Sequence, residues 1–135
     1  MKARTEYLCY TDGSCKSGAD APGGWGYCVL TPDGSALEGH GAAQRTLAKT
    51  MEYRAVAEAL AVLPEGASAI VFSDNQSLVE NLEKNLGIWQ GRAFAKVDEA
   101  IAASARRIDA CIRERKLHVT FRWVRAHNGN PGNEI

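Results

Sequence analysis

The amino-terminal part of the chain has the residue pattern of three β-strands. TEYLCYTD (5–12) alternates and is rich in aromatic residues, GWGYCVLT (24–31) is a second strand pattern, and the turn sequence TPDGS leads into a third, SALEGHGAA (35–43). We expect these segments to pair in chain order as an antiparallel meander.

A helix and a buried strand are predicted next. TMEYRAVAEALAVLP predicts a helix over 50–64, with Thr50 as its N-cap and Pro64 as its end. SAIVFSD (68–74) is a nearly uniform apolar run, as is typical of a central strand covered on both faces.

Two more helices and a closing strand complete the pattern. NQSLVENLEKNL predicts a short helix over 75–86, and LHVTFRWV (117–124) predicts a fifth strand. A longer helix is expected between about Gln90 and Lys116, because apolar residues recur there at helical spacing. Its buried stripe consists of Phe94, Val97, Ile101, Ile108 and Ile112. The order β-β-β-α-β-α-α-β predicts a mixed sheet with packed helices.

The composition is that of one ordinary globular domain over residues 1–135, with 45% hydrophobic and 24% charged residues. No apolar run approaches the ~20 residues that a membrane helix needs, and MKARTEYLCY lacks a signal-peptide core. The cysteines form no CxxC pair, so we expect reduced thiols in a cytoplasmic protein. The small size and unremarkable surface favour a monomer.

Positive charge gathers in the last third of the chain although the net charge is zero. Residues 89–127 contain nine Lys or Arg against four acids. This asymmetry indicates either a surface that faces a polyanion or a solvated, arginine-rich helix face.

Three carboxylates are candidates for one site. Asp12 and Asp74 each end a strand pattern, where ligand sites of α/β sheets gather, although Asp12-Gly13 is also a common turn sequence. Glu52 falls on the apolar face of the 50–64 helix, so it is either a metal ligand or an acid favoured by the helix dipole. Three such carboxylates suit Mg²⁺, and two ions about 4 Å apart would activate a water and stabilise the leaving oxygen of a phosphodiester.

Five segments resemble the type 1 ribonuclease H family in order and spacing: YTDGSC, GGWGYCV, MEYRAVAEAL, VFSDNQ and FRWVRAHNGNPGNE. The resemblance implies an α/β, ribonuclease H-like fold: a five-stranded mixed sheet, three antiparallel strands then two parallel, with helices on both faces. It also implies endonucleolytic, two-metal hydrolysis of the RNA strand of RNA–DNA hybrids to 5′-phosphate and 3′-hydroxyl products. The expected cofactor is Mg²⁺, with Mn²⁺ possible and two ions present when substrate is bound.

The resemblance assigns roles residue by residue. Asp12, Glu52 and Asp74 match the metal-binding acids, and His127 matches a loop histidine that assists proton transfer or product release. Glu134 matches a loop glutamate outside the metal shell. The positions that match nucleic-acid contacts are Gly13, Ser14, Cys15, Arg45, Gln76 and Trp89. Lys49 is expected to compensate as a point charge where Ala48 and Thr50 replace polar or basic residues of the family. Trp89 is equally compatible with a place in the core.

The sequence departs from the family at its carboxyl end. The fourth active-site acid and the final helix that carries it are expected beyond Ile135, with the acid at position 137. Two alternatives therefore stay open: a hybrid- or duplex-binding domain with impaired catalysis, and a ribonuclease H domain cut from a reverse transcriptase. The same fold acting on junctions or in integration is a weaker option.

Overall fold

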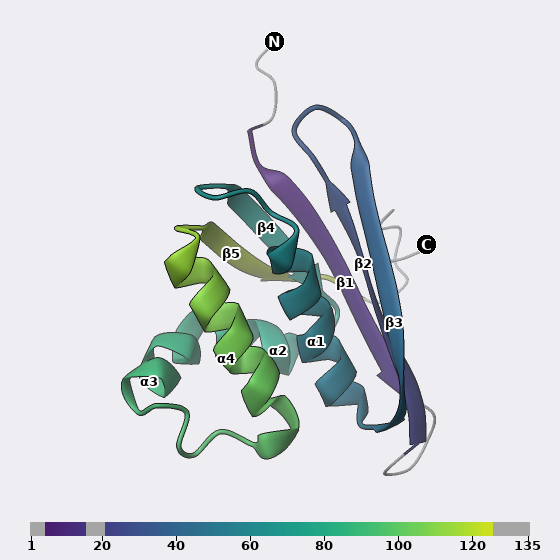
Figure 1. The fold of residues 1–135 in the computed structure, drawn as a ribbon, viewed down its shortest axis with the longest axis vertical. Helices are drawn as coiled ribbons and strands as arrows, with labels where there is room; N and C mark the ends of the chain where they lie inside the picture. Colours follow the sequence, from purple (N-terminus) through teal and green to yellow (C-terminus); the bar gives the residue numbers. More distant parts are fainter. Residues whose placement is uncertain (1–4, 16–20, 126–135) are drawn as a thin grey trace.

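A five-stranded mixed sheet forms the centre of the computed structural model, which describes residues 5–15 and 21–125 (Figure 1). The strand order is β3-β2-β1-β4-β5. The strands are β1 (Tyr7–Cys15), β2 (Ala21–Leu30), β3 (Ala36–Thr46), β4 (Ser68–Ser73) and β5 (His118–Trp123). β2 is antiparallel to both β1 and β3, whereas β4 is parallel to β1 and β5. The predicted sheet, three antiparallel strands followed by two parallel ones, is confirmed.

Strand β1 continues past the aspartate at which we expected it to end. Asp12 pairs with Gly26 and Gly13 with Trp25, so this Asp-Gly pair lies inside a ladder and makes no turn. The expectation of a strand end at Asp12 is wrong. Turn propensity at an Asp-Gly pair is local, and here the ladder with β2 overrides it.

Helix α1 (Ala48–Ala61) begins earlier than predicted. Leu47 is its N-cap and provides no side-chain hydrogen bond, so the assignment of Thr50 as the cap is wrong. Leu47 alone separates the end of β3 from the start of α1, and the chain turns into the helix as soon as it leaves the sheet. The expected apolar face is confirmed, because Ala55, Val56, Ala59 and Leu60 are fully buried.

A continuous helical run of three parts follows β4. It comprises α2 (Gln76–Glu80), the π-helix η1 (Asn81–Asn85) and α3 (Leu86–Gly91). The side-chain amide of Asn81 donates to the Tyr53 hydroxyl of α1 over 3.2 Å, and Asn85 donates to Asn81 over 2.9 Å. These polar contacts tie the π-helical turn to α1.

The single long helix predicted between Gln90 and Lys116 is wrong, because the chain turns between α3 and α4 (Glu99–Glu114). Ala93 and Phe94 adopt left-handed φ values of 52° and 60°, which a helix cannot accommodate. Asp98 then caps α4 by accepting from the Ala100 amide over 2.9 Å. The apolar residues of the predicted stripe nonetheless pack in or against the core.

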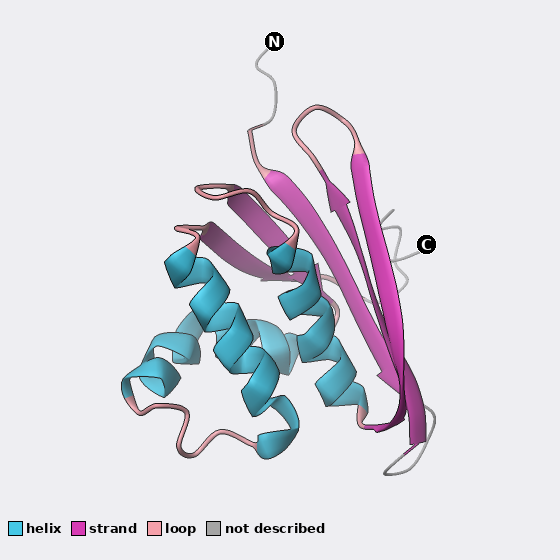
Figure 2. Cartoon of the chain, viewed as in Figure 1, coloured by secondary structure: helices cyan, strands magenta, loops and turns pink. Residues whose placement is uncertain are grey.

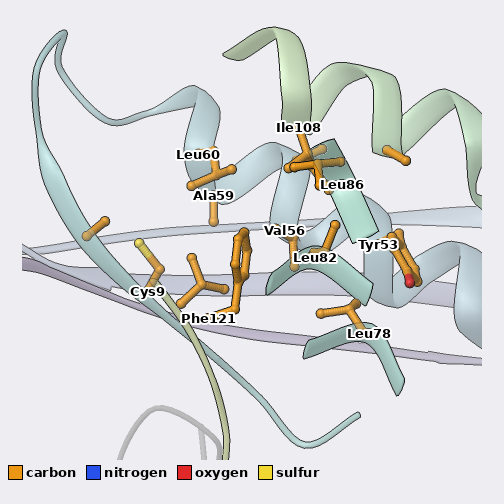
Figure 3. Packing of buried hydrophobic residues seen from close by; sticks show 14 of the residues in the cluster. Cys9, Tyr53, Val56, Ala59, Leu60, Leu78, Leu82, Leu86, Ile108 and Phe121 are labelled. Carbon is orange, nitrogen blue, oxygen red and sulfur yellow. The ribbon is translucent and has the colours of Figure 1, made fainter. Parts of the chain in front are cut away.

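The helices pack on one face of the sheet (Figure 2). Cys9, Val56, Leu60, Ile108 and Phe121 meet in the shared hydrophobic cluster (Figure 3), to which every helix of the described residues contributes. The second helical layer expected on the opposite face does not occur among the described residues. That face carries a stacked pair of rings, Tyr10 and Phe72, with centroids 4.8 Å apart.

The cysteines of the described residues form no disulfide, as the sequence predicts. Cys9, Cys28 and Cys111 are free thiols, and the first two are buried. Within residues 5–15 and 21–125, none of the helices has the length and apolar character needed to span a bilayer.

Candidate active site

The backbone of β1 touches the first turns of α1 at Gly13. A Cβ at this position would lie 2.3 Å from the backbone nitrogen of Glu52 and 2.4 Å from the carbonyl carbon of Met51. No side chain fits at that distance, so only glycine permits the approach. The contact places Asp12, the preceding residue, next to the helix turn that carries Glu52.

Asp74 reaches the same rim through the parallel pairing of β1 and β4. Tyr10 lies opposite Phe72 in this ladder; Asp12 follows two residues later within β1, and Asp74 follows two residues later, just after β4. Because the two strands run parallel and in register, both aspartates lie in the same region of the sheet. Asp12 is exposed and Asp74 is half-buried.

The electrostatics of Glu52 show that the three acids are close together. Glu52 is half-buried, and burial raises the pKa of its carboxyl above the ordinary value; a hydrogen bond from Asn75 acts in the opposite direction. The negative charges of Asp74 and Asp12 raise this pKa further. Such repulsion weakens with distance, which agrees with the contact of Gly13 that brings Asp12 beside the α1 turn of Glu52.

Asn75 is a site residue that the sequence analysis missed. Its side-chain amide donates a hydrogen bond to Oε2 of Glu52, and its side-chain oxygen accepts one from the Leu78 amide over 3.1 Å. An asparagine that directly follows a strand-ending acid and opens a helix was the available signal. That signal predicts only the helix cap, because the contact with Glu52 depends on the packing of α1 against β1, the strand next to β4 in the sheet.

The donor set fits a hard divalent cation. Asp12, Glu52 and Asp74 offer carboxylate oxygens, the ligands that Mg²⁺ prefers together with water and phosphate oxygens. A cation would also relieve the mutual repulsion that raises the pKa of Glu52. In residues 5–15 and 21–125, however, no three Asp, Glu, His or Cys side chains are placed so that they could hold a metal ion together.

A groove of about 300 Å³ extends from Asp12 across the open face of the sheet. Asp12, Gly26 and His40 lie opposite one another on β1, β2 and β3, so the missing side chain of Gly26 leaves a hollow between an acid and a histidine. Ser14 lies in the wall of the same groove. This groove depends on strand register and is not visible in the sequence.

The other predicted contacts have different surroundings. Gln76 is exposed at the first position of α2, and Arg45 is exposed near the end of β3. Lys49 forms an ion pair of 2.5 Å with Asp98, the N-cap of α4. Trp89 packs against the hydrophobic cluster, which favours the core alternative.

Three predicted residues are not placed fully by the structure. The backbone of Cys15 ends β1 in the described range, but its side chain is outside it. His127 and Glu134 lie outside the described residues.

Several arginines of α4 and its end form ion pairs or hydrogen bonds within the protein. Arg107 pairs with Glu58 at 3.2 Å, and Arg113 pairs with Asp109 at 2.8 Å. Arg115 donates to the Ala61 carbonyl over 2.7 Å. These contacts favour the interpretation of this segment as a solvated helix face.

Comparison with known proteins gives a consistent family assignment. The family model described as RNase H matches residues 4–135. The chain is 35% identical over 130 residues to "Ribonuclease H" from Polaromonas naphthalenivorans (strain CJ2), covering 94% of this chain and 80% of the relative.

Solved structures agree with this assignment at the level of the fold. LC9-RNase H1, a type 1 RNase H with the type 2 active-site motif, superposes with a TM-score of 0.75 at 23% identity, covering 96% of this chain and 67% of that one. LC11-RNase H1, solved in complex with an RNA/DNA hybrid, has a TM-score of 0.67 at 19% identity, covering 96% and 92%. The chain belongs to the ribonuclease H family, a family of nucleases that act as hydrolases.

Proposed function

We propose that this protein is an endonuclease that hydrolyses the RNA strand of RNA–DNA hybrids with divalent cations held by Asp12, Glu52 and Asp74. The observation that carries the proposal is the contact of Gly13 with the backbone of Met51 and Glu52, which sets Asp12 beside the helix turn of Glu52. The charges of Asp74 and Asp12, after burial, also raise the pKa of Glu52. Three nearby acids on a sheet rim are costly to hold without a cation, and such a cluster is typical of a functional site.

Each acid has its own place at the site. Asp12, exposed in the groove, would hold the cations together with Glu52 of α1 and Asp74, which directly follows β4. Bound Mg²⁺, or Mn²⁺ in its place, would activate a water for attack on the phosphodiester and stabilise the leaving oxygen. The products are a 5′-phosphate and a 3′-hydroxyl. His127 is proposed to assist departure of the product.

The hybrid is proposed to lie over the rim and the adjoining groove. Ser14 and Gln76 are exposed beside the acids, where they can approach the minor groove and the 2′-hydroxyls that distinguish RNA from DNA. The backbone at Gly13 and Cys15 and the side chain of Arg45 are further proposed contacts. Support comes from LC11-RNase H1, whose structure contains an RNA/DNA hybrid.

The setting of the protein is also a proposal. We treat residues 1–135 as one domain that acts as a monomer. The three free cysteines in the described part of the chain support a reducing compartment such as the cytoplasm.

The deciding experiment compares cleavage of a labelled RNA–DNA hybrid by the wild type, Asp12→Asn and Asp74→Asn, each in Mg²⁺ and in Mn²⁺. We expect both variants to lose cation-dependent cleavage while they keep the wild-type fold by circular dichroism. Glu65→Gln, which removes an exposed carboxylate from the turn after α1, should cleave like the wild type. Near-normal rates for either aspartate variant would contradict the proposal.

One observation favours a second candidate function, a hybrid-binding domain with impaired catalysis. Among the described residues the acids do not already form a complete ligand group. If the wild type binds the hybrid but does not cleave it in either metal, this second function replaces the first.

A further inference from the structure

Asn75 is held at the rim by three hydrogen bonds that join three segments. Its backbone amide donates to Oγ of Ser73 over 3.1 Å, at the end of β4. Its side-chain oxygen accepts from the Leu78 amide over 3.1 Å and thereby caps α2. Its side-chain nitrogen donates to Oε2 of Glu52 on α1.

The cap fixes which end of the carboxamide faces Glu52. An asparagine side chain has one accepting oxygen and one donating nitrogen, and the Leu78 amide requires the oxygen. The nitrogen must then point toward Glu52, where an oxygen would repel the carboxylate. The same rotamer therefore satisfies the cap and the acid.

The choice of asparagine is informative, because serine or aspartate would cap α2 about as well. Serine is too short to reach Glu52 from this position, and ionised aspartate has no hydrogen to donate. Among the favoured capping residues, asparagine alone combines an acceptor for the helix with a donor long enough for the acid.

We propose that Asn75 is a positioning residue that orients the Glu52 carboxylate toward the cation site it shares with Asp12 and Asp74. The proposal rests on the function proposed above. By holding Oε2, the amide sets the direction of the whole carboxylate and keeps it directed at the rim despite two neighbouring negative charges. Hydrogen-bond partners of metal ligands commonly change metal affinity by about 10- to 100-fold when they are removed.

A structural role and a positioning role have different signatures, and the test separates them. Asn75→Ser keeps the helix cap and removes the donor to Glu52. Asn81→Ser is the matched control, because it also removes an amide donated to α1, but that amide is bonded to the Tyr53 hydroxyl and to none of the three acids. The affinity for Mn²⁺ is measured by calorimetry on protein without hybrid, and Tm is measured without cation.

We expect Asn75→Ser to raise the Kd for Mn²⁺ about tenfold with little change in the cation-free Tm, because the cap is kept. Asn81→Ser should lower Tm and leave the Kd unchanged. The inference would be overturned if Asn75→Ser bound Mn²⁺ as tightly as the wild type. It would also be overturned if Asn81→Ser lost as much affinity for Mn²⁺ as Asn75→Ser. Should Asn75→Ser fail to fold, Asn75→Thr makes the same change and is judged by the same outcomes.

The wild type and Asp12→Asn separate this inference from the function on which it rests. Mn²⁺ binding by the wild type that is lost in Asp12→Asn supports the cation site independently of Asn75. If the wild type itself binds no Mn²⁺, the proposed function fails, and the positioning role fails with it.

Discussion

The two ends of one face of α1 have opposite chemistry. Toward its carboxyl end, Val56 and Leu60 are fully buried among apolar side chains (Figure 3). Near its amino end, Glu52 faces two other carboxylates and a single amide donor. The helix therefore stabilises the fold through one end of this face and holds a repulsive cluster at the other.

This contrast shows where the protein trades stability for function. Burial of an apolar side chain contributes about 1.5–3 kcal/mol, whereas neighbouring like charges oppose folding. Substitutions in the apolar part should lower stability and leave the cleavage rate intact. Substitutions in the acidic part should lower the cleavage rate without lowering stability.

The largest effect is expected for Glu52→Gln. The amide keeps the shape of the side chain and removes its charge, so we expect cleavage of the hybrid to fall at least about 100-fold. The free energy of unfolding should stay equal or rise, because repulsion from Asp12 and Asp74 is removed. Single-turnover cleavage and urea denaturation measure the two quantities. A loss of stability parallel to the loss of rate would remove the contrast between the two ends of the helix.

Leu60→Ala tests the apolar end. Leu60 is fully buried, and truncation of such a residue should lower the free energy of unfolding by about 3 kcal/mol. The cleavage rate per folded molecule should remain close to wild type at a temperature where the variant is folded. A rate that falls far more than the folded fraction would show that the core and the acids are coupled.

Gly13→Ala should affect both regions, because it acts where they meet. The added methyl would lie 2.3 Å from the Glu52 backbone nitrogen, so α1 must move away from β1. We expect a loss of about 1–3 kcal/mol in stability and a clear loss of cleavage as Asp12 and Glu52 separate. The control is Gly87→Ala in α3, where nothing lies within 4 Å of the new Cβ and helix propensity predicts a slight gain. If Gly13→Ala resembles this control, the close approach does not constrain the site.

The smallest effect is expected for the pH dependence of stability that arises from Cys9, a buried thiol on the apolar side of the sheet. Burial, with a smaller contribution from Cys28, raises the pKa of the Cys9 thiol from 9.0 to about 12. Between these values the folded protein retains a proton that the unfolded chain loses, so stability falls as pH rises through this window, by at most about 1.4 kcal/mol per pH unit. Urea denaturation of wild type and Cys9→Ala from pH 8 to 11 isolates this slope. If stability falls equally with pH in the wild type and in Cys9→Ala, the raised pKa of Cys9 is contradicted.

Much of the fold could be predicted because its signals are local. The apolar run of β4 and the apolar face of α1 are visible in the sequence, and both are buried as expected. The errors occurred where distant contacts override local preference. Asp12-Gly13 has turn propensity but pairs with β2, and the helical spacing around Phe94 conceals a left-handed turn.

The candidate site shows the same division. Asp12, Glu52 and Asp74 are candidates on strand and helix-face patterns alone, although β1 runs on past Asp12, and the charges of both aspartates act on Glu52 in the structure. The contact of Asn75 with Glu52 and the place of His40 in the groove could not be read in this way. The first depends on how α1 packs against β1, beside β4, and the second on a cross-strand row that leaves Gly26 between His40 and Asp12.

The sequence by itself determined the order of strands and helices, the burial of the apolar stripes and the identity of three acids, because periodicity and residue chemistry act over short stretches of chain. Only the tertiary structure decided how these acids approach one another, which amide holds Glu52 and where the groove lies. Those features depend on strand register and on the contact between Gly13 and α1, and both are fixed by interactions between residues far apart in the chain.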